Sequence, residues 1–315
     1  MRSKTRPASQ RGRKPAFTAL ALAAMLASAP ALAFEIDTGN PDITLRWDNT
    51  VKYSAGYRLH DADAALASDV NLGDGDTNFQ RRGLISNRFD LLSELEGTYK
   101  NVGFRVSGAA WQDARYLRAN ANNTAGAFGP GTSAVNSTEI SAPNQFSPYT
   151  RTTHGRDTEL LDAFVSTKFD VAGHASTVRL GQHTVVWGES LFFGDNGIAG
   201  AMSPVDVAKA LSVPNLRFQE ILRPVPQVSG QFQIDENLTA YAYYQPKWVE
   251  NRSQGAGSYF SPIDFQAGGN LLFTPGGPFI RTGTQDGKDS GQGGVSLKYR
   301  GEDTDYGLYL VRFNS

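Results

Sequence analysis

Apolar and polar residues alternate along a long stretch near the start of the chain. From Ile43 to Leu59 the odd-numbered positions are apolar or aromatic, with Asn49 as the exception, and the even-numbered positions are polar or small. A period of two predicts a β-strand. Soluble strands usually have about 3–10 residues, so this strand is long. A tilted strand that crosses a bilayer needs about 9–11 residues, and this one could extend beyond it.

The same alternation recurs in eight further segments, which predicts a chain built from antiparallel strands. The segments are residues 88–99, 104–110, 161–169, 178–186, 227–234, 238–245, 295–300 and 306–313. The fourth of the nine segments sets Asp162, Ser166 and Lys168 against an apolar face of Leu161, Ala163, Val165 and Phe169. The last segment, 306–313, is apolar on both faces, so the pattern does not orient it.

Short and long connections alternate between these segments. Short turns lie at 100–103, 171–175, 235–237 and 301–305, and long polar loops lie at 59–80, 114–157, 188–223 and 247–291. Long loops at every second connection are unusual in a compact soluble domain, but they are typical of outer-membrane barrels. The predicted fold class is therefore all-β, an antiparallel transmembrane β-barrel. A soluble β-sandwich with insertions is the alternative.

The strand count indicates an incomplete barrel. Single-chain bacterial barrels have an even number of strands, whereas about nine are predicted here. An open edge in lipid would cost several kcal/mol for each unsatisfied polar group. We therefore interpret residues 34–315 as the N-terminal part of a longer barrel. Assembly of one barrel from several chains is the alternative.

Aromatic residues tend to mark the ends of the predicted strands. One group lies beside the short turns, at Tyr99, Phe104, Phe169 and Tyr299. A second group lies toward the long loops, at Tyr57, Trp111, Trp187 and Trp248. Two aromatic girdles are expected where a barrel meets the two membrane interfaces.

The first residues predict export. Six cations precede any acid, at Arg2, Lys4, Arg6, Arg11, Arg13 and Lys14. An apolar run from Ala16 to Ala29 follows, and then Ala31-Leu32-Ala33. This order is typical of a secretory signal peptide, residues 1–33, cleaved after Ala33. The alternative is an N-terminal anchor, although the run is shorter than the ~20 residues of a spanning helix. We therefore expect localisation in the outer membrane.

Composition narrows the classes of function. Without residues 1–33 the chain has 24 cations against 31 acids, a net charge of −7, which argues against a nucleic-acid partner. The absence of cysteine excludes disulfides, thiolate catalysis and cysteine-based zinc sites. The four histidines have no metal-ligand spacing, and no phosphate loop or dinucleotide fingerprint is present. We expect no catalytic activity, cofactor or metal.

Several stretches resemble one protein family. They are residues 73–79 (GDGDTNF), 86–90 (SNRFD), 179–190 (RLGQHTVVWGES), 203–207 (SPVDV) and 222–226 (LRPVP). In this order they resemble the domain-of-unknown-function 1302 family, although His183 and Val186 depart from its pattern. The resemblance implies a longer Gram-negative outer-membrane protein. It also implies two partners, an exported periplasmic protein and a resistance-nodulation-division type exporter, and hence hydrophobic or lipid-like cargo.

The polar strand faces supply the candidate site residues. They are Arg46, Asp48, Lys52, Arg88, Asp90, Glu94, Arg105, Asp162, Arg179 and His183. In a barrel they would line the lumen, where rows of mixed charge select small polar solutes. The alternative is that they pair with one another and plug the interior.

Two loop motifs have local interpretations. Asp74, Asp76 and Asn78 are spaced like the start of a calcium loop, but Phe79 and Ile85 stand where such a loop needs Gly and Glu. We favour a turn at the loop base. Ser203 and Pro204 predict a helix that runs to Leu211, with Ser203 as its cap. This helix either folds inward and constricts the pore or lies on the surface.

The predicted function is a passive outer-membrane channel for small or amphipathic molecules, in contact with outer-membrane lipid. The alternative is a non-transporting envelope component that works with a periplasmic partner and an exporter on lipid-like cargo.

Overall fold

A computed structural model describes residues 32–122, 144–188 and 198–314 of the chain. Most of the predicted signal peptide, residues 1–31, lies outside the described residues. In the described parts no helix is long and apolar enough to cross a membrane.

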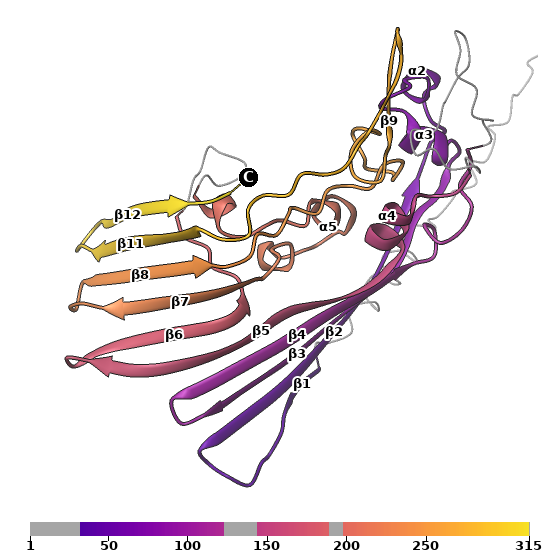
Figure 1. The fold of residues 1–315 in the computed structure, drawn as a ribbon. Helices are drawn as coiled ribbons and strands as arrows, with labels where there is room; N and C mark the ends of the chain where they lie inside the picture. Colours follow the sequence, from indigo (N-terminus) through magenta and orange to yellow (C-terminus); the bar gives the residue numbers. More distant parts are fainter. Residues whose placement is uncertain (1–31, 123–143, 189–197, 315) are drawn as a thin grey trace, which may run out of the picture.

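The described chain is dominated by one antiparallel sheet of ten strands (Figure 1). Neighbours in the sheet follow the order β1-β2-β3-β4-β5-β6-β7-β8-β11-β12. The strands are β1 (Leu32–Glu35), β2 (Ile43–Arg58), β3 (Gly83–Tyr99), β4 (Val102–Asp113), β5 (Arg156–Val171), β6 (His174–His183), β7 (Val225–Gln233), β8 (Leu238–Gln245), β11 (Gln292–Arg300) and β12 (Asp305–Arg312). A separate hairpin pairs β9 (Leu271–Thr274) with β10 (Gly277–Ile280).

The all-β antiparallel prediction is confirmed at this level. Each of the nine predicted segments overlaps one strand, from β2 to β8 and then β11 and β12. The pattern missed β1 and the β9–β10 hairpin, because four-residue strands are too short to display a period. No pairing joins β1 to β12 in the described residues, so this sheet is open.

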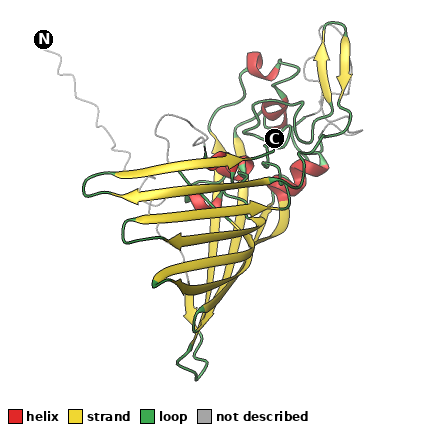
Figure 2. Ribbon diagram, turned by 60° about the vertical axis from the view of Figure 1, so that its left-hand side comes forward, coloured by secondary structure: helices red, strands yellow, loops and turns green. Residues whose placement is uncertain are grey.

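The short turns lie at one end of the sheet and the long connections lie at the other (Figures 1 and 2). The pairing of β2 with β3 shows the polarity, since it runs from Ile43↔Tyr99 beside a short turn to Arg58↔Gly83 beside a long loop. The helices gather at the long-loop end, where the sheet curls around part of the connecting chain (Figure 2). We call the two ends the turn end and the loop end.

The exposure of apolar and polar side chains on the two faces of the sheet is the reverse of that in a soluble protein. Apolar side chains on the outer face are largely exposed, for example Phe89 at 57%, Val51 at 54% and Leu308 at 71%. Several polar side chains on the inner face are buried, among them Arg88 at 4% and Gln227 at 3%. Soluble sheets bury the apolar face because its transfer out of water stabilises the fold. The exposed apolar face therefore requires a different environment or a covering partner.

One predicted face needs a correction. The pairing of β4 with β5 shifts between Val106↔Ala163 and Gly108↔Leu160, which adds one residue to β5. This β-bulge reverses the alternation. Leu160 is 55% exposed on the outer face, and Leu161 lines a cavity on the inner face beside Asp162, so the assignment of Leu161 to the apolar face was wrong.

The structure also orients the strand that the pattern left open. In β12, Tyr306, Leu308 and Leu310 are exposed on the outer face. The alternate residues Tyr309 and Val311 pack against a buried cluster of Trp187, Met202 and Tyr243. The second apolar face of β12 is therefore explained by packing inside the curl of the sheet.

The aromatic residues predicted at the strand ends are exposed at the turn end, but at the loop end two of them are buried. The four aromatic residues beside the short turns are exposed, at Tyr99, Phe104, Phe169 and Tyr299. At the loop end Tyr57 is exposed, but Trp111 and Trp187 are buried. Trp111 fails as an outer anchor because it lies on the inner face, where its indole N–H donates to the Thr152 carbonyl at 3.2 Å.

The long loops pack together into a folded cap at the loop end. Its apolar centre is an aromatic-rich cluster of Phe79, Ile85, Tyr116, Phe146 and Tyr259. The predicted turn at residues 74–78 forms a short helix, α3 (Asp74–Asn78), beside α2 (Ala64–Ala67). The Asn78 side-chain amide donates to the Gly257 carbonyl at 2.8 Å, which connects the first loop to the last. These contacts between distant loops give the cap a defined structure.

His154 is a buried polar contact of this cap. It lies in the one-turn π-helix η1 (Arg151–Gly155), directly after α4 (Pro148–Thr150), and is 1% exposed. Its Nε2 accepts a hydrogen bond from the Gly255 N–H at 3.2 Å, and its ring stacks on Tyr116. Burial, together with the positive charge of Arg88, lowers the pKa of His154 to about 3. The imidazole is therefore neutral in the folded cap.

This depressed pKa predicts a pH-dependent stability. His154 binds a proton below about 6.5 when unfolded but only below about 3 when folded, so it makes the fold less stable as pH falls through that window. The slope is at most about 1.4 kcal/mol per pH unit. We expect His154→Gln, which keeps a hydrogen-bond acceptor, to flatten the dependence of the free energy of unfolding between pH 6.5 and 4.5. Urea titrations at several pH values, followed on unheated gels, would measure the free energy of unfolding. The same pH dependence in wild type and His154→Gln would contradict the prediction.

Candidate functional site

The ten predicted lining residues lie on the inner face of the sheet, around three adjoining cavities. Seven border the largest cavity, of about 970 Å³: Arg46, Asp48, Glu94, Arg105, Asp162, Arg179 and His183. Lys52 and Asp90 border a small cavity of about 30 Å³, and Arg88 borders another of about 20 Å³. The alternation of the strands therefore brought together residues from five strands of the sheet.

Ion pairs connect the charges around the large cavity. Arg105 contacts three acids, Glu94, Glu96 at 3.3 Å and Asp162 at 3.3 Å. Arg46 contacts Asp48 and lies 3.7 Å from Glu96. These pairs link β2, β3, β4 and β5 across the inner face. They compensate the charges, yet the cavity beside them stays open at about 970 Å³.

Both ring nitrogens of His183, at the end of β6, have hydrogen-bond partners. Its Nδ1 lies 3.0 Å from the Gly181 carbonyl, and its Nε2 lies 2.7 Å from the Ser229 hydroxyl. A carbonyl only accepts, so Nδ1 carries the proton and Nε2 accepts from Ser229. In a Ser-His-Asp triad an acid would occupy the position of the carbonyl. The arrangement therefore orients the ring at the edge of the cavity.

The connection between β6 and β7 folds against the inner face. We call residues 199–224 the inward segment. It contains η2 (Ala199–Ala201), helix α5 (Val207–Ser212) and η3 (Phe218–Glu220). Lys209 and Glu220 border the charged cavities beside strand residues such as Asp90. Of the two positions expected for the helix, the inward one is observed.

The start of that helix was predicted three residues early. The carboxylate of Asp206 accepts from the Lys209 N–H at 2.7 Å and caps α5. The predicted cap, Ser203, instead donates to the Val185 carbonyl at 3.0 Å. Both residue types are good caps. The Ser203 hydroxyl is engaged by the segment that follows β6, which leaves the capping position to Asp206.

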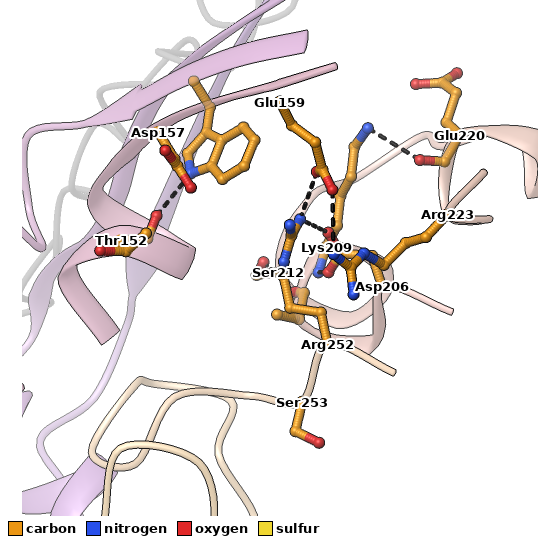
Figure 3. A network of polar contacts seen from close by, with 12 residues as sticks. Thr152, Asp157, Glu159, Asp206, Lys209, Ser212, Glu220, Arg223, Arg252 and Ser253 are labelled. Atoms are coloured by element: carbon orange, nitrogen blue, oxygen red, sulfur yellow. Dashed lines mark hydrogen bonds and ion pairs between the residues drawn. The ribbon is translucent and has the colours of Figure 1, made fainter. Parts of the chain in front are cut away.

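A cluster of charges holds the inward segment in place (Figure 3). Arg252, from the last long loop, contacts Asp206 at 2.7 Å and Glu159 of β5 at 2.9 Å. Arg223 lies 3.3 Å from the same Glu159. Backbone bonds reinforce the junction, since the Arg252 N–H donates to the Val205 carbonyl at 3.0 Å. The cluster joins β5, the inward segment and the last loop.

A second contact joins the inward segment to β2. Lys52 lies 3.4 Å from the Glu220 carboxylate, and the Lys209 ammonium donates to the Glu220 carbonyl at 3.0 Å. Burial lowers the pKa of Lys209, although nearby acids oppose the shift. Burial would raise the pKa of Glu220, but hydrogen bonds from Arg217 and the charge of Lys52 bring it below its ordinary value. Ion pairing therefore compensates the partial burial of these charges.

Sequence reasoning missed the residues that position this segment: Glu159, Lys209, Glu220, Arg223 and Arg252. Four of them lie in long loops, where charges have no period that assigns them to a face. Glu159 lies in β5 beside the bulge that disturbs the alternation. No metal-binding group of three or more His, Cys, Asp or Glu residues occurs in the described ranges.

Comparison with known proteins identifies a matching family. The model of a family described as "Protein of unknown function (DUF1302)" matches residues 14–315. No curated protein and no solved structure matches the chain.

The charge cluster generates a stability prediction. Arg252→Gln leaves Glu159 and Asp206, which are 19% and 9% exposed, without one of their cationic partners. We expect the free energy of unfolding to fall by about 1–3 kcal/mol. Arg46→Gln is the matched control, because that side chain is 55% exposed and its loss should hardly change stability. Equal urea midpoints for wild type and Arg252→Gln would contradict the structural role.

Proposed function

We propose that this chain, which belongs to DUF1302, a family of proteins of unknown function, is an outer-membrane β-barrel. It would act as a passive channel for small or amphipathic molecules. The observation that carries the proposal is the inversion of the sheet. Its apolar side chains are exposed on the outer face, and its charges lie on the inner face. In a membrane the outer face would contact lipid, and the inner face would line water.

Three further features support a barrel over a soluble sandwich. All neighbouring strands of the main sheet pair in antiparallel orientation. Their connections are short turns at one end of the sheet and long loops at the other. Exposed aromatic residues mark the turn end, as at a membrane interface. The predicted signal peptide, residues 1–33, would deliver residues 34–315 to the envelope. Cleavage after Ala33 would remove the first half of β1 (Leu32–Glu35), so closure would require strands that pair with β2 and β12, from this chain or from another copy.

The interior supports a narrow channel. The large cavity, with its rows of acids and arginines, would be the wide part of the lumen. The inward segment and its ion pairs would form the narrow part, where cavities of only about 20–30 Å³ separate the side chains. Mixed charges along such a wall act on the solutes that pass.

A lipid-facing substitution tests the architecture. Val51 lies in the middle of β2 and is 54% exposed. In a soluble sheet Val51→Arg would change stability by no more than about 0.5 kcal/mol. In a barrel it would cost about 2–4 kcal/mol at the bilayer midplane. Leu66→Arg, which is 61% exposed in the cap, is the control.

The measurement uses the full chain in outer-membrane fractions, compared on gels before and after boiling. We expect a folded form that changes mobility on boiling, and Val51→Arg should reduce it while Leu66→Arg does not. Recovery only from the periplasm, with one mobility, would overturn the proposal.

Ion selectivity tests the channel. Arg105 is paired with three acids, so Arg105→Gln leaves uncompensated negative charge beside the cavity. We expect the reversal potential in a planar bilayer under a salt gradient to shift toward cation selectivity. Arg281→Gln, in the cap, should leave it unchanged. A folded barrel without any current would contradict channel function and would favour the alternative role with a periplasmic partner and an exporter.

A further inference from the structure

A separate apolar cavity lies on the loop-end side of the inward segment. Its volume is about 600 Å³. Strand residues Ser54, Gly56 and Ser86, near the loop ends of β2 and β3, form one wall. Residues 210–218 and Ile221 of the inward segment form another, and Phe260 of the last loop contributes a third. The charged cavity lies on the opposite side, toward the turn end.

The lining of this cavity differs from the rest of the inner face. Leu211, Phe218 and Phe260 border it and remain 54%, 51% and 42% exposed. The large cavity toward the turn end is lined mainly by polar or charged side chains. Three large apolar side chains that stay exposed around one cavity indicate a surface suited to a hydrocarbon group.

One charged residue borders the apolar cavity. Arg217 lines it and also lines the charged cavity, so it stands at the boundary between them. Its side chain is 71% exposed, and its Nε lies 3.1 Å from the Glu220 carboxylate. A guanidinium has five N–H donors, which suits it to bind a second carboxylate alongside Glu220.

We propose that this cavity binds a medium-chain aliphatic carboxylate, with the hydrocarbon chain against Leu211, Phe218 and Phe260 and the carboxylate at Arg217. The cavity falls within the usual 300–1,000 Å³ of small-molecule sites, which are mostly apolar with a few polar groups that orient the ligand. The inference rests on the proposed function, because the inner face becomes a lumen only in a closed barrel. It narrows the channel's substrates to anionic amphiphiles.

The test measures binding directly. The full chain is placed in nanodiscs of zwitterionic lipid and titrated calorimetrically with hexanoate, octanoate and decanoate, with the heats of empty nanodiscs subtracted. Burial of each added methylene should tighten binding by up to about fourfold. The alcohols of equal length should bind more weakly, because they lack the charge that Arg217 attracts.

Two variants and two controls assign the site. Phe218→Ser should weaken octanoate at least tenfold. Arg217→Gln should weaken octanoate but leave octanol unchanged. Phe279→Ser and Arg281→Gln change exposed residues near the β9–β10 hairpin, away from the cavity, and should bind octanoate like the wild type.

The outcomes separate this proposal from channel function. Affinity that does not depend on chain length, or equal weakening by Phe218→Ser and Phe279→Ser, would overturn the site. Octanoate binding without any bilayer current would support the site while the channel fails. Normal currents without octanoate binding would retain the channel and overturn the site.

Discussion

The inter-strand hydrogen-bond ladder sets the direction of every side chain in the ten-stranded sheet. Once β2 pairs with β3 from Ile43↔Tyr99 onward, alternate residues must face opposite sides. The sequence places its apolar residues on one side and its charges on the other. In water alone, the apolar face of this open sheet would therefore stay in unfavourable contact with solvent. The exposed apolar face and the paired charges of the inner face are two consequences of this one constraint.

The inner face compensates its charges by pairing them, and the same pairs fold the inward segment against the wall. Arg252 joins Asp206 to Glu159, while Lys52 reaches Glu220. Breaking such partly buried pairs is costly because the remaining partner keeps its desolvation penalty. The inward segment is therefore held in place. It separates a charged cavity from an apolar one on the inner face of the sheet.

The long loops use a different interaction. In the cap, Phe79 and Tyr116 pack with their neighbours, and buried polar groups such as Asn78 and His154 bond to backbone of the last loop. Buried polar groups with satisfied partners make such packing specific. The cap thus stabilises the end of the sheet where the inward segment begins. It also holds Phe260 of the last loop in position as one wall of the apolar cavity.

The sequence by itself determined nine of the ten strands of the main sheet, their antiparallel order and the inner-face location of all ten candidate residues, because a period of two is a local property that backbone geometry enforces. It could not orient β12 or foresee the bulge in β5, since both depend on what the strand packs or pairs with. It also missed Arg252, Arg223 and Lys209. Loop charges lack any period, so only the tertiary structure decided which of them meet Glu159 and Glu220 and divide the interior.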